Sequence, residues 1–234
     1  MRIRTALLVA SALTLPISAS AQWSTRQFSV TPRGGFMTFD NSSGIDNAPY
    51  IGVDAAYAVS PFLSIGTGLT ISRPQTIGDY FISQLSFGDT TLYLAVEQPL
   101  MMIDVALNAQ ARYPGDRITP FLNGGIGYYT LDLDPQVETR PERVGGISGN
   151  VGAGLLFRLG EQVGIQLEVR DLIFTGFERD DLNPVAAAFN NTRYPEDFEP
   201  PPAAKETVHN IMFGIGFSFV PRSGVVADAG EESR

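Results

Sequence analysis

Charged and amide side chains recur at every second position in several stretches of this 234-residue chain. Between Val163 and Arg170, for example, Gln166, Glu168 and Arg170 alternate with apolar residues. Alternation of this kind places polar groups on one face of a β-strand. The full set is Asp54, Asp104, Asn108, Gln110, Arg112, Arg158, Gln166, Glu168 and Arg170.

Three acids and three bases in this set could pair in a buried interior, where unpaired charges are unfavourable. The sequence therefore predicts a lumen network of polar side chains. A structural polar core is the interpretation we favour, and a gated path for protons or small ions is the alternative. The residues of the predicted network are Asp54, Asp104, Arg112, Arg158, Glu168 and Arg170.

Catalytic chemistry finds little support in the sequence. His209 is the single histidine, it lacks a neighbouring His-x-Ser pattern, and its parity places it on the outward face with Ile211. The chain has no Cys, which excludes disulfides, thiolate metal sites and cysteine nucleophiles. We predict no catalytic residues, no cofactor and no enzyme activity.

Two groups of acids could provide hard oxygen ligands for calcium. Asp132 lies two residues before Asp134, and Glu178 precedes Asp180 and Asp181. Neither spacing matches a twelve-residue calcium loop. Solvated loop acids are the better interpretation, and no metal site is predicted.

The stretch from His209 to Phe219 best defines the elements that position these residues. Large apolar residues occupy its odd positions from Ile211 onward, and Met212, glycines and Ser218 occupy the even ones. This pattern predicts a strand with one greasy face and one slim face, as suits the crowded interior of a narrow barrel.

Eight such segments, separated by turn-rich stretches, span residues 27–219. The first, residues 27–39, is the least regular, because Pro32 and Gly34-Gly35 interrupt it. The fifth, residues 119–132, slips phase around Tyr128-Tyr129, which predicts a bulge or an interfacial aromatic pair. No apolar run has the length of a spanning helix, so crossing a membrane would require a closed barrel.

The third and fourth segments are unusually long and nearly equal. Gly88-Asp89 between them is typical hairpin chemistry. Folding there pairs Phe87 with Thr90 and Phe62 with Gly115, so we expect one long hairpin whose distal part, residues 73–98, stands outside the bilayer. Bends are expected at Pro74 and Pro99 near its root. Two additional membrane strands, giving ten, are the alternative.

The start of the chain carries the pattern of a secretory signal peptide. Arg2 and Arg4 precede an apolar run, and Ala19-Ser20-Ala21 forms an A-x-A cleavage site. Removal of residues 1–21 leaves 14 basic and 25 acidic residues, a net charge of about −11 that argues against nucleic acid as a partner. We predict a barrel domain over residues 22–219 and a polar periplasmic tail over residues 220–234.

The predicted connections alternate between long and tight. The last long one, residues 178–206, contains five prolines and seven acidic against three basic residues. Long connections on one side and tight turns on the other are typical of outer-membrane barrels, and an even strand number returns both ends to the tight-turn side.

This pattern resembles the small eight-stranded outer-membrane barrels of the OmpA/OmpX type. The ending Gly214-x-x-Phe217-x-Phe219 resembles their terminal-strand assembly signal, although fifteen residues follow it here. The resemblance implies an all-β, antiparallel up-and-down barrel in the bacterial outer membrane.

Three functions fit such a barrel. The first is a structural or surface-interaction protein with a filled lumen, the second a narrow channel for ions or small apolar solutes, and the third a lipid-modifying enzyme. Expected partners are outer-membrane lipid and lipopolysaccharide, the barrel-assembly machinery, and a surface partner of loops 73–98 and 178–206. The protein is expected to be a monomer.

Overall fold

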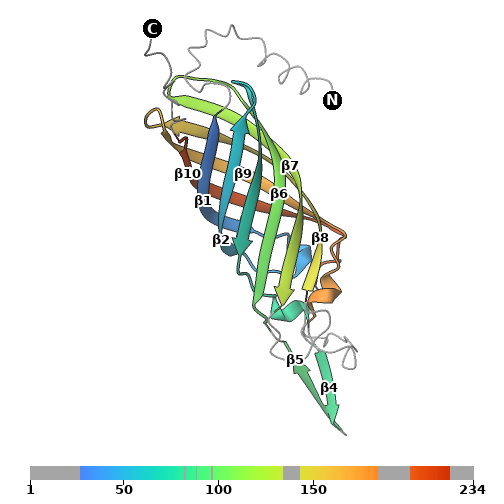
Figure 1. Cartoon of the computed structure of the whole chain (residues 1–234). Coiled ribbons are helices and arrows are strands. Elements are labelled where there is room, and N and C mark those ends of the chain that lie inside the picture. Colours follow the sequence, from blue (N-terminus) through green and yellow to red (C-terminus); the bar gives the residue numbers. More distant parts are fainter. Residues whose placement is uncertain are drawn as a thin grey trace, which may run out of the picture.

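Eight antiparallel strands close into a barrel in the computed structural model (Figure 1), as the sequence predicts. The structure describes residues 27–81, 83–87, 89–95, 97–133, 143–183 and 201–221. The order around the barrel is β1-β10-β9-β8-β7-β6-β3-β2. These strands are β1 (Phe28–Thr38), β2 (Ala48–Ala58), β3 (Leu63–Ser72), β6 (Leu100–Arg112), β7 (Ile118–Leu133), β8 (Arg143–Arg158), β9 (Val163–Thr175) and β10 (Thr207–Phe219).

Shorter elements lie in the long connections. In the described parts of these connections, three 3-10 helices, η1 (Asn41–Ser43), η2 (Gly78–Tyr80) and η3 (Arg179–Leu182), occur at one end of the barrel. A separate two-stranded ribbon, β4 (Ser83–Phe87) and β5 (Thr90–Leu94), belongs to the same end, here called the long-loop end. The opposite, short-turn end holds the tight turns, the first residues of β1 and the last residues of β10. Among the described residues, no helix is long and apolar enough to cross a membrane.

The outward faces of the strands carry large apolar side chains. Ile51 and Leu107 are 67% and 68% exposed, and Phe213, Ile215 and Phe217 are about half exposed. On β10 this belt runs over residues 211–219, about the nine to eleven residues that a tilted strand needs to span a bilayer. The glycines of the inward face allow close approach: a Cβ at Gly35 would lie 1.9 Å from the Phe213 carbonyl oxygen.

The predicted phase slip at Tyr128-Tyr129 is wrong. Tyr128 is 56% exposed and Tyr129 is fully buried, and alternation continues unbroken through β7. The pairing of β7 with β6 and β8 keeps a constant register, without a bulge. What looks like a change of phase in the sequence is a change in the polarity of the inward face, which becomes apolar at Tyr129, Leu131 and Leu133.

The predicted long hairpin differs in its register. Phe87 does pair with Thr90 in the ribbon, but in the barrel Ser72 pairs with Met102 and the Arg112 amide donates to the Phe62 carbonyl. Ten residues join β3 to β4 and seven join β5 back to the paired part of β6, so the two ladders differ by three residues. The 3-10 turn of η2 absorbs the excess, and the arms are therefore not one continuous hairpin.

Candidate functional site

Four charged side chains, of which Arg33, Glu168 and Arg170 are buried and Asp54 is partly buried, meet in the middle of the lumen. Arg33 Nε lies 3.0 Å from Asp54 Oδ2, and Arg170 Nη2 lies 3.4 Å from the same oxygen. Arg170 Nε also donates to Glu168 Oε1 at 2.7 Å. These side chains come from inward positions of strands β1, β2 and β9. The ion pairs therefore connect β9 with strands that are far from it in the sequence.

Neutral donors and acceptors complete this cluster. Glu168 accepts hydrogen bonds from Asn123 Nδ2 and, at 3.1 Å, from Gln166 Nε2. Arg33 Nη2 donates to Thr70 Oγ1 at 2.8 Å, and its guanidinium lies 5.6 Å from the ring centre of Tyr50. We call Arg33, Asp54, Asn123, Glu168 and Arg170 the polar network. Its charges are mutually compensated, which is the condition for tolerating ions in a low-dielectric interior.

The remaining predicted lumen residues lie at other levels. Asp104 is buried and accepts a hydrogen bond from Ser148 Oγ, whereas we expected it to join the ion pairs. Arg158 Nη2 donates to Thr119 Oγ1 at 3.2 Å near the short-turn end. Arg112 also faces the lumen near that end. The structure thus brings together Asp54, Glu168 and Arg170 but not all six residues.

Arg33 was missing from the predicted set, although it is 7% exposed and central to the polar network. The cause is the irregular appearance of the first segment, with Pro32 and two glycines. The outward residues Phe28 and Phe36 share even parity, and that signal alone would have placed Arg33 inside.

A small polar cavity lies between the polar network and the short-turn end. It has a volume of about 50 Å³, and its lining includes Ser64, Asn108, Gln110 and Arg112. Ser64 Oγ and Asn123 Oδ1 face it without a hydrogen-bond partner among the described residues. Since one water needs roughly 10–15 Å³ of such space, the cavity can hold a few water molecules.

An apolar core fills the lumen at the long-loop end. Tyr129 and Phe174 stack at its centre with ring centroids 3.9 Å apart. Because the barrel wall continues past the belt of outward apolar residues, this core extends beyond the membrane level. The apolar core consists of Met37, Phe39, Ile45, Ala48, Tyr50, Phe81, Leu100, Met102, Tyr129, Leu131, Leu133, Val144, Leu172, Phe174, Phe177, Leu182, Val208 and Met212.

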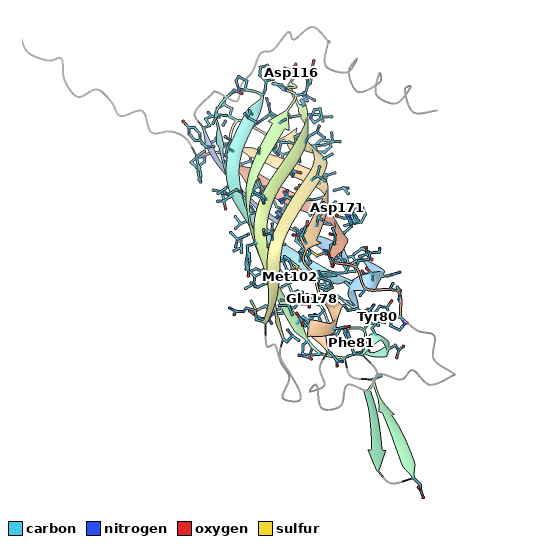
Figure 2. The ribbon with its side chains drawn as sticks, turned by 90° about the vertical axis from the view of Figure 1, so that its right-hand side faces the viewer. Tyr80, Phe81, Met102, Asp116, Asp171 and Glu178 are labelled. Atoms are coloured by element: carbon cyan, nitrogen blue, oxygen red, sulfur yellow. The ribbon has the colours of Figure 1, made fainter. Side chains whose placement is uncertain are left out.

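Arg179 of η3 ties three connections into a roof over the apolar core. Its Nη1 donates to the carbonyl oxygens of Pro202, at 2.6 Å, and Ser42, at 3.4 Å. Its guanidinium also lies 5.7 Å from the ring centre of Tyr80 in η2. Figure 2 shows Tyr80, Phe81 and Glu178 gathered at this end, far from Asp116 at the other. The roof is therefore a connected structure.

Asp40 anchors the first connection of this roof. It accepts hydrogen bonds from the amide and hydroxyl of Ser42, and Lys205 Nζ lies 3.2 Å from its carboxylate. Burial alone would raise the pKa of Asp40, but these donors outweigh it and hold that pKa below its usual range. Asp40 is thus charged at neutral pH and links the first and last long connections.

Outward polar residues mark the upper limit of the apolar belt. His209 Nδ1 lies 2.8 Å from Asp171 Oδ2 on the outer wall, with His209 half exposed. Asp132 forms an exposed ion pair with Arg143. Over the described residues, no three acidic or histidine side chains are placed to hold a metal ion; Asp134 lies outside that part of the chain.

Comparisons with known proteins place these features in a family. The model of the outer membrane protein β-barrel domain matches residues 5–219. Among curated proteins, none matches the chain.

Solved structures show a similar fold. Neisserial surface protein A is similar over 82% of this chain and 96% of its own, with 10% identity and a TM-score of 0.53. Ail of Yersinia pestis, solved with a heparin analogue, is similar over 84% of this chain and 100% of its own, with 11% identity and a TM-score of 0.43. OprG of Pseudomonas aeruginosa is similar over 84% of this chain and 98% of its own, with 14% identity and a TM-score of 0.43. The chain belongs to the outer membrane protein β-barrel domain family and is a protein of the bacterial outer membrane.

Proposed function

We propose that this protein is a closed barrel of the surface-interaction type, which holds a structured end above the membrane and does not conduct solutes. The observation that carries this proposal is the apolar core, which occupies the lumen at the long-loop end. Tyr129, Phe174, Met102 and Met212 in it are all under 2% exposed. A lumen packed in this way leaves no aqueous route.

The polar network supports the same function. An eight-stranded barrel has an interior just wide enough for side chains. Arg33, Asp54, Glu168 and Arg170 fill that width with ion pairs, next to the apolar core on its short-turn side. An ion crossing the barrel would have to disrupt both layers in series.

The roof supports an interaction role. Binding residues are commonly carried on loops that a rigid scaffold positions. Here Arg179 and the Asp40–Lys205 pair hold connections from distant parts of the sequence together. A partner would therefore meet a surface that is largely assembled before binding, which lowers the entropic cost of association.

Single-channel recording in planar bilayers tests the closed state. We expect no conductance steps from the refolded protein. Arg33→Ala, which removes one charge of the polar network, should also stay closed because the stacked Tyr129 and Phe174 of the apolar core remain. Reproducible steps from the unaltered protein would contradict the proposal.

A narrow channel is the second candidate, and the polar cavity favours it. Ser64 and Asn123 face this cavity with unpartnered oxygens, as the wall of a hydrated path would. Proton flux into liposomes that hold the protein, measured with a pH-sensitive dye, separates the two candidates. Flux above that of empty liposomes would favour the channel.

Export and orientation are parts of the proposal. Residues 1–21 lie outside the described part of the chain, and N-terminal sequencing of the membrane form should begin at Gln22. We expect the long-loop end to face the cell exterior. An Asp89→Cys variant should then react with a membrane-impermeant maleimide on intact cells; labelling only after the outer membrane is broken would reverse the orientation.

A further inference from the structure

The wall of the polar cavity carries an excess of positive charge. The charged residues that line this cavity are Arg112, Arg170 and Asp54. In the polar network, Asp54 and Glu168 form their ion pairs with Arg33 and Arg170, so those four charges balance. The excess charge on the cavity wall therefore comes from Arg112.

The surroundings of Arg112 add to this positive charge. Arg158 lies near enough for its own charge to act on Arg112, and Asp116 acts in turn on Arg158. The turns and strand ends at residues 59–63, 112–118 and 158–163 together hold three basic and two acidic residues, Arg112, Arg117, Arg158, Asp116 and Glu161. The short-turn end is thus locally cationic in a chain whose formal net charge is −9.

Ser64 places a hydrogen-bond donor at the same cavity. It is 1% exposed, and its Oγ has no hydrogen-bond partner among the described residues. A buried hydroxyl without a partner is unfavourable, so the group that fills the cavity should accept a hydrogen bond from it. The side-chain amides of Asn108 and Gln110 are further donors on the cavity wall.

We propose that the polar cavity binds a small monovalent anion, for which chloride is the probe. Arg112 supplies the compensating charge and Ser64 a hydrogen bond, which are the two conditions for holding an ion in a buried site. This inference goes beyond the proposed function, because a bound anion is compatible with a closed barrel.

The size of the cavity limits what it can hold. Its volume is about 50 Å³, and one water needs roughly 10–15 Å³ of such space, so a small anion fits with water beside it. That water can donate to Asn123 Oδ1, an acceptor that does not bind the anion itself. Water alone would satisfy Ser64 and Asn123, but it would leave the charge of Arg112 without a counterion in the cavity.

Thermal unfolding of the full barrel in uncharged detergent micelles tests for binding. The ionic strength is held constant with mixtures of sodium chloride and sodium gluconate. A ligand that binds only the folded protein raises its melting temperature as the ligand concentration rises. We expect chloride and bromide to raise the melting temperature, and sulfate, which is too large for the cavity, to have no such effect.

Three variants assign the effect to the cavity. Arg112→Gln removes the compensating charge and should weaken chloride binding about tenfold or more. Arg117→Gln makes the same change at an exposed arginine of the same end and should alter the affinity less than about twofold. Ser64→Ala keeps every charge but removes a donor, and should weaken binding about tenfold. A boiled and unboiled gel shift confirms that each variant retains the barrel.

Crystals grown in sodium bromide locate the ion, because bromine scatters X-rays anomalously near its absorption edge. A bromide peak in the cavity beside Arg112 and Ser64 is the expected result. Water alone in the cavity, or bromide bound only at the exposed Arg117, overturns the proposal. A chloride effect that Arg112→Gln leaves intact overturns it too. Conductance steps in planar bilayers would instead contradict the closed barrel and leave the anion site standing.

Discussion

Two levels of the same barrel wall have opposite polarity. On β9 at the membrane level, Glu168 points inward and is 8% exposed, while the outward Val169 is 48% exposed. At the long-loop level, Phe174 points inward and is fully buried, while Thr175 is outward and exposed. One strand therefore combines the pattern of a membrane protein with that of a soluble one.

The difference shows that alternation and polarity have separate causes. The pleat alone decides which residues face outward. The surrounding medium decides their polarity: lipid cannot solvate charge, so the membrane level is apolar outside, whereas water around the long-loop level makes apolar burial inside favourable. Each level should therefore respond differently to the same kind of substitution.

The largest effect is expected at the membrane level of the lumen. Arg170→Leu takes an ion-pair partner from the buried Glu168 and the partly buried Asp54, and should lower the free energy of unfolding by about 3–5 kcal/mol. Denaturant titration in micelles measures it. The matched control is Arg143→Leu, because Arg143 forms an exposed ion pair with Asp132 and its loss should lower the free energy of unfolding far less. Equal effects of the two substitutions would mean that the polar network does not contribute to the stability of the barrel.

The next effect concerns the apolar core. Leu172 is 1% exposed, and Leu172→Ala should cost about 2–5 kcal/mol through lost burial and a residual cavity. Leu167→Ala, five positions away on the lipid-facing side, should cost clearly less because lipid can fill the space. The same titration decides. A larger loss for Leu167 would mean that the two levels do not differ as described.

A smaller effect, on assembly, is expected at the end of β10. Phe217 and Phe219 are outward and about half exposed. Changing both to Ala should leave export intact and lower the fraction of folded barrel several-fold, since lipid-facing area and the terminal aromatic pattern are both lost. The boiled and unboiled gel shift of the membrane fraction measures it. Normal levels of folded barrel would count against the assembly role.

The smallest effect is a pH dependence of the roof. The pKa of Asp40 is lower in the folded protein than in the unfolded chain, so its stabilisation is present above the unfolded value and is lost as pH falls through the folded one. The gain at neutral pH should be at most about 1 kcal/mol. Asp40→Asn should therefore lower the melting temperature at pH 7, and the difference from the unaltered protein should vanish as pH falls through the lowered pKa of Asp40. A constant difference at all pH values would assign the effect to something other than charge.

Much of the fold could be predicted because the pleat of a strand imposes a period-two alternation of residue types on the sequence. The alternation around Glu168 and Arg170 placed both in the lumen, and the slim face of β10 predicted a narrow barrel. The constant period was misread at Tyr129, where the change of surroundings imitates a change of phase. Register across long connections depends on turns such as η2, which strand periodicity does not encode. Arg33 escaped because Pro32 obscured an otherwise regular strand.

The opposite polarity of the two levels can be measured directly on β7. The native chain has no cysteine, so single nitroxide labels can replace outward residues one at a time. Labels at Leu122 and Ile126 should collide mainly with oxygen dissolved in lipid, and labels at Thr130 and Asp132 mainly with a water-soluble nickel complex. A label at the inward Leu131 should be shielded from both. Oxygen-dominated collisions at Thr130 and Asp132, or a water-accessible Leu131, would contradict the account.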